Sequence, residues 1–280
     1  MSPEQEGRDA AEEYRQQHHL GTQPLGDLIA LIDLEEGIDV AVIRSPADDA
    51  HGITVRDPHT GTTMLIVTAT DNPTRLRSTI AHELGHHLFG DKTPDGNDWN
   101  SRVSQESRAT AFARHLLLPV AALGDLLGEP DTSRPIRESD VSALVQRFNL
   151  SPQMVAIQLG EARFIGEEQR ERWMRLRTPD LATRYGWGGP YALWQADSRA
   201  TRPPQRLLQR AIDGYAQGLV SIDTIARLED LDAKATLAAL TEAGIVVEPT
   251  VAEAADVADL PGAHVQDPLA AYDAEFGVDG

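Results

Sequence analysis

Residues 72–90, NPTRLRSTIAHELGHHLFG, constrain the fold most, because they predict one helix with two chemically different faces. Asn72 suits the N-cap, Pro73 suits the first helical position, and Gly90 suits the residue that ends the last turn. Apolar residues at steps of four predict the face that packs on the core: Leu76, Ile80, Leu84 and Leu88. The helix is therefore expected to lie between a core and an open surface.

The opposite face carries groups that can bind a metal ion. His82 and His86 are four residues apart, so a helix points both rings the same way. Glu83 lies about 100° round the helix from His82, close enough to act on a water beside the metal without binding the metal itself. Metal-assisted peptide hydrolysis needs this arrangement. His87 lies nearer the apolar side and is expected to be a structural residue.

Two imidazoles do not complete such a site, because catalytic zinc usually has three protein ligands. The chain has no cysteine, so the third ligand has to be His, Asp or Glu. Asp91, Asp95 and Asp98 are available in a polar loop predicted at 91–104. A loop is a poor place to hold a metal ligand in position.

Glu106 is a better third ligand than the loop aspartates. It lies on an amphipathic helix predicted at 104–119. The small residues Ala109 and Ala113 beside it would let that helix approach the histidine helix closely. His115 is nine residues further on, so a regular helix points it about 180° away from Glu106.

A small antiparallel sheet is expected ahead of the histidine helix. A helix at 26–36, ended by Gly37, precedes an alternating strand at 39–44. Strands at 52–57 and 62–70 flank DPHTG and are expected to form a hairpin. A peptide substrate could pair with an exposed strand of this sheet. An ordinary sheet edge without such a role is the alternative.

The rest of the chain is expected to be helical with one ordered loop. Short helices are predicted at 139–150 and 151–162, with Ser139 and Ser151 as N-caps. The aromatic segment RYGWGGPYALW, at 184–194, is expected to be an ordered loop, and further helices are expected between 203 and 244.

HELGH and the later stretch ESRATAFARHLLLP together resemble the ImmA/IrrE family of metallopeptidases over about residues 20–165. The second family motif runs roughly E-x-x-A-N-x-F-A-x-x-L-L-x-P, and the matching positions are Glu106, Ala109, Phe112, Ala113, Leu116, Leu117 and Pro119. Thr110 replaces the usual Asn, so the resemblance does not carry over the hydrogen bond that this Asn would make beside the metal ligands. Ser78 replaces an aromatic residue. Many relatives carry an N-terminal helix-turn-helix domain, and residues 1–40 show no such pattern.

The resemblance implies an α+β fold, a mainly helical zincin-like metallopeptidase domain with a small antiparallel sheet, at residues 21–165. It implies that His82, His86 and Glu106 hold zinc, with manganese as the alternative metal. Glu83 would be the general base of a gluzincin-like metalloendopeptidase. Relatives typically cleave a helix-turn-helix repressor or antitoxin, so the resemblance implies a regulatory protease.

No second oxyanion-stabilising residue is identified. The candidates are His115, His87, Tyr185 and the arginines. A non-catalytic, metal-containing regulator that acts by partner binding is the alternative to an enzyme. Glu83 would have no purpose in such a protein.

Other segments flank the predicted domain. We expect a helical or flexible segment at 1–20, a helical C-terminal region at 166–247, and an acidic, disordered tail at 248–280. Residues 203–244 could dock a partner, and the aromatic loop could bind a ligand, although plain packing explains both. The acidic tail could cover the site.

The formal net charge of −19 favours a basic partner and argues against nucleic acid binding by the chain itself. The helix pair at 139–162 resembles a helix-turn-helix, but its second helix, SPQMVAIQL, has no Lys or Arg. No apolar run approaches 18 residues, and the N-terminus is polar and acidic. We therefore expect a cytoplasmic protein that does not contact a membrane.

Overall fold

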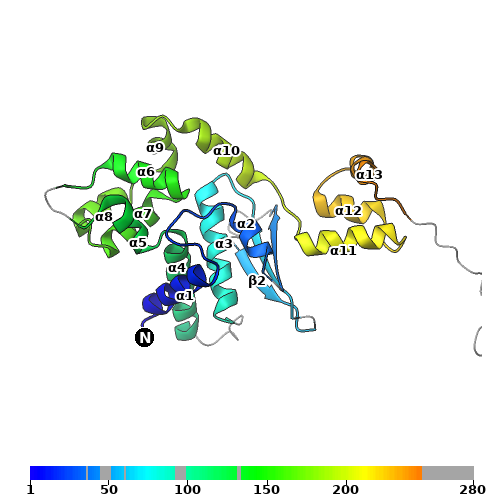
Figure 1. The fold of residues 1–280 in the computed structure, drawn as a ribbon, viewed down its shortest axis with the longest axis horizontal. Coiled ribbons are helices and arrows are strands. Elements are labelled where there is room, and N and C mark those ends of the chain that lie inside the picture. Colours follow the sequence, from blue (N-terminus) through cyan, green and yellow to red (C-terminus); the bar gives the residue numbers. More distant parts are fainter. Residues whose placement is uncertain (36, 45–51, 60, 92–98, 131–133, 248–280) are drawn as a thin grey trace, which may run out of the picture.

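The computed structural model describes residues 1–35, 37–44, 52–59, 61–91, 99–130 and 134–247 (Figure 1). Within these ranges the chain is mainly helical with one small sheet, as the sequence predicts. The strands are β1 (Ile38–Ile43), β2 (Gly52–Arg56) and β3 (Thr63–Thr68). The first helices are α1 (Pro3–Gln17), α2 (Leu28–Asp33), α3 (Pro73–Leu88), α4 (Trp99–Leu117), α5 (Val120–Leu127), α6 (Glu138–Phe148) and α7 (Pro152–Glu161). The later helices are α8 (Glu167–Trp173), α9 (Thr178–Arg184), α10 (Gly188–Arg199), α11 (Gln205–Ala216), α12 (Ile222–Glu229) and α13 (Ala233–Glu242).

The sheet is mixed, which corrects the expectation of an antiparallel sheet. β2 and β3 form the predicted antiparallel hairpin, with Ile53 opposite Ile66. β1 instead pairs with β3 in parallel, with Val40 opposite Leu65. The order β1-β3-β2 puts β3 in the middle. Alternation of apolar residues within a strand does not report strand direction, so the sequence pattern could not show this pairing.

α3 is the helix that the sequence predicts most completely. The Asn72 side chain accepts a hydrogen bond from the backbone N–H of Arg75 at 3.2 Å, and Pro73 occupies the first turn. Leu76, Ile80 and Leu84 are buried as expected. Leu88 is 41% exposed, so the last residue of the predicted apolar stripe is not part of the core.

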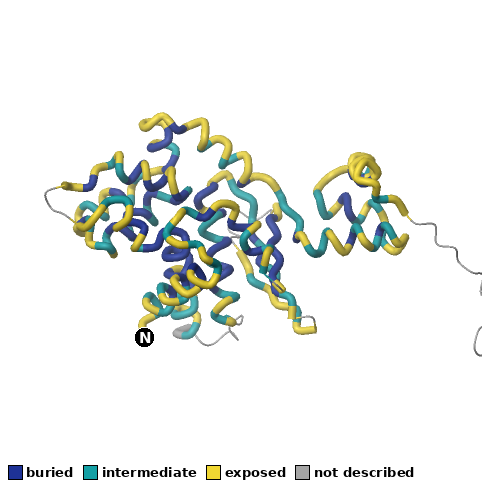
Figure 2. Tube along the Cα trace, in the orientation of Figure 1, coloured by how far each residue is buried: buried dark blue, intermediate teal, exposed yellow. Residues whose placement is uncertain are grey.

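α3 and α4 lie side by side at the centre of the molecule, in close contact (Figure 1). A Cβ atom added at Gly85 would lie 3.1 Å from the Phe112 ring and 3.2 Å from the Cα of Ala109. The predicted small residue Ala109 thus does allow close approach. Buried positions extend from this helix pair and the sheet into α5, α6 and α7, which share the main core (Figure 2).

α1 covers the side of α4 that faces away from α3. Ala11 and Tyr14 of α1 belong to the main core. A Cβ atom added at Gly7 would lie 2.4 Å from the carbonyl oxygen of Arg108, so the two backbones are in direct contact there. The N-terminal segment, predicted as helical or flexible, is thus helical over Pro3–Gln17.

Three local expectations differ from the structure. The helix expected at 26–36 is only the six-residue α2. The N-cap of α6 is Arg137, whose backbone N–H donates to the Asp140 carboxylate at 2.8 Å, and not Ser139. Ser151 does cap α7, because its hydroxyl accepts from the backbone N–H of Met154 at 3.2 Å. α4 begins at Trp99, so the residues 99–104 assigned to a loop are helical.

The aromatic segment 184–194 is mostly helix, which corrects the prediction of a loop. α9 ends at its first residue, and α10 begins at Gly188. The rings of Trp187, Tyr191 and Trp194 pack on one another with centroid distances of 5.6–6.4 Å. Trp187 is 3% exposed, and its indole N–H donates to the Ser142 hydroxyl at 3.0 Å. The hydrogen bond from Trp187 to Ser142 joins the start of α10 to α6.

α11, α12 and α13 form a small helical group at the far side of the sheet (Figure 1). Its own core consists of Ala211, Tyr215, Ile225 and Leu240, separate from the main core. Most of its surface is exposed or half-buried (Figure 2). The predicted acidic tail at 248–280 lies outside the described residues.

One described stretch, Ser101–Leu127, is apolar and long enough to cross a membrane by composition, with a mean hydropathy of 1.3. Pro119 separates its two helices, and 61% of that window is buried within the protein. The burial makes it weak evidence for a membrane span, since core helices have the same composition.

Candidate active site

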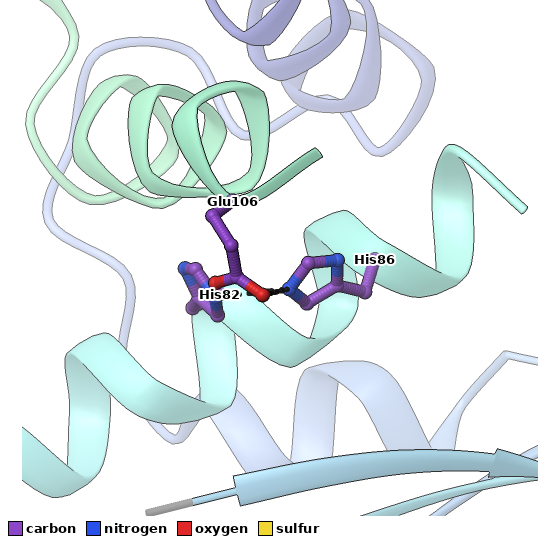
Figure 3. A group of neighbouring side chains, drawn as sticks. All are labelled: His82, His86 and Glu106. Carbon is purple, nitrogen blue, oxygen red and sulfur yellow. Dashed lines mark hydrogen bonds and ion pairs between the residues drawn. The ribbon is translucent and has the colours of Figure 1, made fainter. Parts of the chain in front are cut away.

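Three predicted metal ligands converge between α3 and α4. His82 and His86 project from α3, and Glu106 points toward both rings from α4 (Figure 3). The Nε2 atoms of His82 and His86 are 3.0 Å apart. Glu106 Oε2 lies 3.2 Å from His82 Nε2, and its Oε1 lies 3.7 Å from His86 Nε2.

This donor set fits a zinc ion. Zinc–nitrogen and zinc–oxygen bonds of about 2.0–2.1 Å in a tetrahedron separate neighbouring donor atoms by about 3.3 Å. The observed separations of 3.0, 3.2 and 3.7 Å lie around that value. Three protein ligands also leave one coordination position open, as a catalytic site requires.

Each histidine has a polar partner at its other ring nitrogen. His86 Nδ1 lies 2.9 Å from Asp91 Oδ2, and Asp91 is almost fully buried. His82 Nδ1 lies 3.4 Å from the hydroxyl oxygen of Thr110. Thr110, which replaces the usual Asn, therefore still offers a hydrogen-bonding group, although at a long distance. Burial, followed by the proximity of His86, lowers the pKa of His82 and so favours the neutral, ligating form.

Glu83 lies in the same cleft without belonging to the donor set. Its Oε2 accepts a hydrogen bond of 2.7 Å from the Thr54 hydroxyl on β2. A Cβ atom added at Gly52 would lie 2.6 Å from Glu83 Oε1, so β2 is in contact with this carboxylate. Burial raises the pKa of Glu83, and the Thr54 hydrogen bond acts in the opposite direction. A desolvated carboxylate of this kind is suited to accept a proton.

These groups line a cleft of about 640 Å³ between β2, α3 and α4. His82, Glu83, His86 and Glu106, the four residues predicted for the site, all lie in its lining. Among the arginines considered for oxyanion stabilisation, Arg102 is the one in the described lining of the cleft. The cleft is large enough for several residues of an extended peptide.

Three of the other sequence candidates, His115, Tyr185 and His87, are not among the residues that line this cleft. His115 is 3% exposed and lies 3.0 Å from Glu4 on α1. Tyr185 hydrogen-bonds Glu138 at 3.4 Å, and His87 is not among the lining residues. Asp91 lines the cleft as a partner of His86, not as a third ligand. Asp95 and Asp98 lie outside the described residues.

Sequence reasoning missed Gly52, Thr54 and Arg108. Gly52 and Thr54 contact Glu83 only because β2 lies beside α3. The Arg108 guanidinium forms an ion pair with the Asp91 carboxylate. Asp91 was considered as a metal ligand and not as a partner of His86. The sequence carried a signal for its position, because it directly follows Gly90, the residue predicted to end the histidine helix. For Arg108, Gly52 and Thr54 the sequence carries no local signal.

A helix that carries two histidines and a glutamate in this pattern, together with a carboxylate from a second helix that could complete a metal site, is typical of a metallopeptidase-like domain. Residues 35–160 match the family model described as the IrrE N-terminal-like domain, Peptidase_M78. This segment therefore belongs to the ImmA/IrrE family, as the two motifs indicated. No curated protein matches the chain.

Proposed function

We propose that this protein is a zinc-dependent endopeptidase with a regulatory role, which cleaves a specific protein partner in the cytoplasm. The observation that carries the proposal is the position of Glu83. Its carboxylate faces the same cleft as His82, His86 and Glu106, is largely buried, and is held by Thr54 at 2.7 Å without being one of the donors. A purely structural metal site has no use for such a base.

The chain's own residues supply most of the chemistry. A zinc ion held by His82, His86 and Glu106 would polarise the scissile carbonyl and make a water more acidic. Glu83 accepts the proton of that water as its oxygen attacks the carbonyl carbon. Glu83 then delivers the proton to the departing amine, so the general base ends in its starting state. The raised pKa of Glu83 suits both transfers.

The sheet offers a place for the substrate backbone. At the β1 edge, Arg202 forms an antiparallel bridge with Val42, and Arg206 binds the carbonyl oxygen of Ile38. Among the described residues no strand pairs with the other edge, β2, whose residues Gly52, Ile53 and Thr54 line the cleft. An extended peptide could add to β2 and pass beside Glu83.

The partner we propose is a helix-turn-helix repressor or antitoxin, the substrate class that the family resemblance implies. Such proteins carry clusters of Lys and Arg because they bind DNA. The formal net charge of −19 on this chain would favour the encounter with a basic partner. Cleavage of a repressor would release the genes that it controls.

The test is Glu83→Gln, compared with the unchanged protein on a helix-turn-helix repressor encoded next to its gene. The amide keeps an oxygen that can accept from Thr54 but cannot take up a proton at neutral pH. We expect zinc content and partner binding to be retained, and cleavage to fall by about 10²–10⁴-fold. Gel analysis of the partner, with zinc measured by elemental mass spectrometry, reads out both quantities.

Glu106→Gln is the matched control, because it also removes one carboxylate from the cleft. It should lose both zinc and cleavage, whereas Glu83→Gln should lose cleavage alone. Equal partner turnover by Glu83→Gln would contradict the mechanism. Partner binding without cleavage by the zinc-loaded, unchanged protein would favour the non-catalytic regulator.

A further inference from the structure

A buried aspartate at the end of α3 connects the metal site to the N-terminal helix. Asp91 Oδ2 lies 2.9 Å from His86 Nδ1, and its side chain is 4% exposed. Its Oδ1 forms an ion pair with the guanidinium of Arg108 on α4. Both carboxylate oxygens are thus used, one on a metal ligand and one on a cation.

Arg108 is itself held from two other directions. Its guanidinium lies over the Phe89 ring, 4.7 Å from the centroid. Its Nη1 lies 3.6 Å from Glu6 Oε2 on α1. α1 (Pro3–Gln17) lies outside residues 35–160, which match the family model. The connection Glu6–Arg108–Asp91–His86 therefore starts in a part of the chain that the family match does not include.

This connection determines which ring nitrogen of His86 carries the lone pair that can bind a metal. An ionised Asp91 can only accept hydrogen bonds, so His86 Nδ1 has to carry the proton and donate it. The lone pair then lies on Nε2, the atom that faces His82 and Glu106. Arg108 keeps the carboxylate in place and compensates its charge in a buried position.

We propose that Asp91 is a positioning residue for His86, and that Arg108 and the N-terminal helix α1 hold Asp91 in place. α1 is therefore part of the support of the metal centre and does more than cover the core. The proposal rests on the metal site of the proposed function but not on peptidase activity. It concerns metal affinity and ligand geometry, which can be measured without a substrate.

The test is the zinc dissociation constant of the full-length protein, determined by competition with a chromophoric chelator. Asp91→Asn should weaken zinc binding by about 10–100-fold, the usual effect of removing the hydrogen-bond partner of a metal-ligating histidine. The visible spectrum of the cobalt(II)-loaded variant should also change, because the spectrum reports the geometry of the ligands. A loss of stability alone would not move that spectrum. Glu6→Gln should weaken zinc binding by about two- to fivefold, a small but measurable effect, since a partly exposed ion pair contributes little.

Glu4→Gln is the matched control for Glu6→Gln. Glu4 also joins α1 to α4, but through Arg114 and His115, away from Asp91. We expect Glu4→Gln to leave zinc affinity unchanged. Equal effects of both glutamate variants would overturn the role of α1. An Asp91→Asn protein with unchanged zinc affinity and an unchanged cobalt spectrum would overturn the role of Asp91. If the unchanged protein bound no zinc, the proposed function would fail. If the unchanged protein bound zinc and Asp91→Asn bound it equally well, only the positioning role of Asp91 would fail.

Discussion

His86 and His115 lie on the two central helices, and each is joined to a carboxylate that also binds an arginine. His86 lies 2.9 Å from Asp91, which pairs with Arg108. His115 lies 3.0 Å from Glu4, which pairs with Arg114. The two histidines nevertheless belong to different kinds of region, an open cleft and a closed packing interface between α1, α4 and α7.

The difference lies in what the second ring nitrogen faces. The Nε2 of His86 faces His82 and Glu106 in the cleft, so its lone pair is available for a metal. The Nδ1 of His115 faces the side-chain amide of Gln158 at 3.3 Å. The Gln158 oxygen accepts from Arg114 Nε at 2.9 Å, so its NH₂ group is the part that points at His115. His115 therefore has no lone pair left, which makes it a structural residue.

The largest expected effect separates the two regions by zinc affinity. Glu106→Gln removes a proposed metal ligand, so the loss of zinc affinity should exceed the roughly 10–100-fold loss caused by changing the hydrogen-bond partner of a ligand. His115→Asn should change zinc affinity by less than about twofold, since it touches no donor. Elemental analysis and chelator competition on both variants measure this. Strong zinc loss in His115→Asn would show that the packing interface around His115 also supports the metal site.

The next effect concerns stability at the two faces of α4. Gly7→Ala puts a Cβ atom 2.4 Å from a backbone oxygen of α4, so α1 has to shift. This strain exceeds the gain in helix propensity of about 1 kcal/mol, and we expect a net loss of about 1–3 kcal/mol. Gly85→Ala meets Phe112 at 3.1 Å and Ala109 at 3.2 Å, which can be relieved by small movements. The gain in helix propensity, about 1 kcal/mol, offsets that strain and leaves this variant nearly neutral. Urea unfolding measures the free energy of unfolding of both variants. Equal losses of stability would contradict the difference in packing between the two faces of α4.

A smaller effect is the response of stability to acid. Burial lowers the pKa of His115 below its usual 6.5, so the unfolded chain takes up the proton first as the pH falls. Stability is therefore full above about pH 6.5 and is lost as the pH falls through the folded pKa. His115→Asn should flatten the fall in melting temperature between pH 7 and pH 5. The slope should not vanish, because burial also lowers the pKa of His82 and of His87. An unchanged slope would show that His115 does not titrate in this way.

The smallest expected effect is at Thr110. Its hydroxyl lies 3.4 Å from His82 Nδ1, a long hydrogen bond, so Thr110→Val should weaken zinc binding by no more than about tenfold. Thr110→Asn restores the usual family residue and should bind zinc at least as tightly as the unchanged protein. Chelator competition compares the three proteins. A loss in Thr110→Val as large as that in Asp91→Asn would show that both histidines depend equally on their partners.

Much of the site was predictable because its signals are local. His82, Glu83 and His86 follow from spacing on one helix, whose ends are marked by Asn72 and Gly90. Glu106 followed from a second motif and from the small residues beside it. The parallel pairing of β1 with β3 and the helix that begins at Gly188 were not predictable in this way, because each depends on contacts with another part of the chain, such as Trp187 with Ser142. The N-cap of α6 was misassigned although its contact, between Arg137 and Asp140, is local.

The sequence by itself determined the chemical types and the faces that present them, because the helical period places residues four apart on one side. It thereby predicted three candidate donors, His82, His86 and Glu106, and the position of Glu83 near them, and the fold brings these residues together. Only the tertiary structure decided that Thr54 holds Glu83, that Asp91 orients His86, and that α1 reaches Asp91 through Arg108. These contacts join residues on different elements, from 5 to more than 100 positions apart, and such distances are set by packing rather than by periodicity.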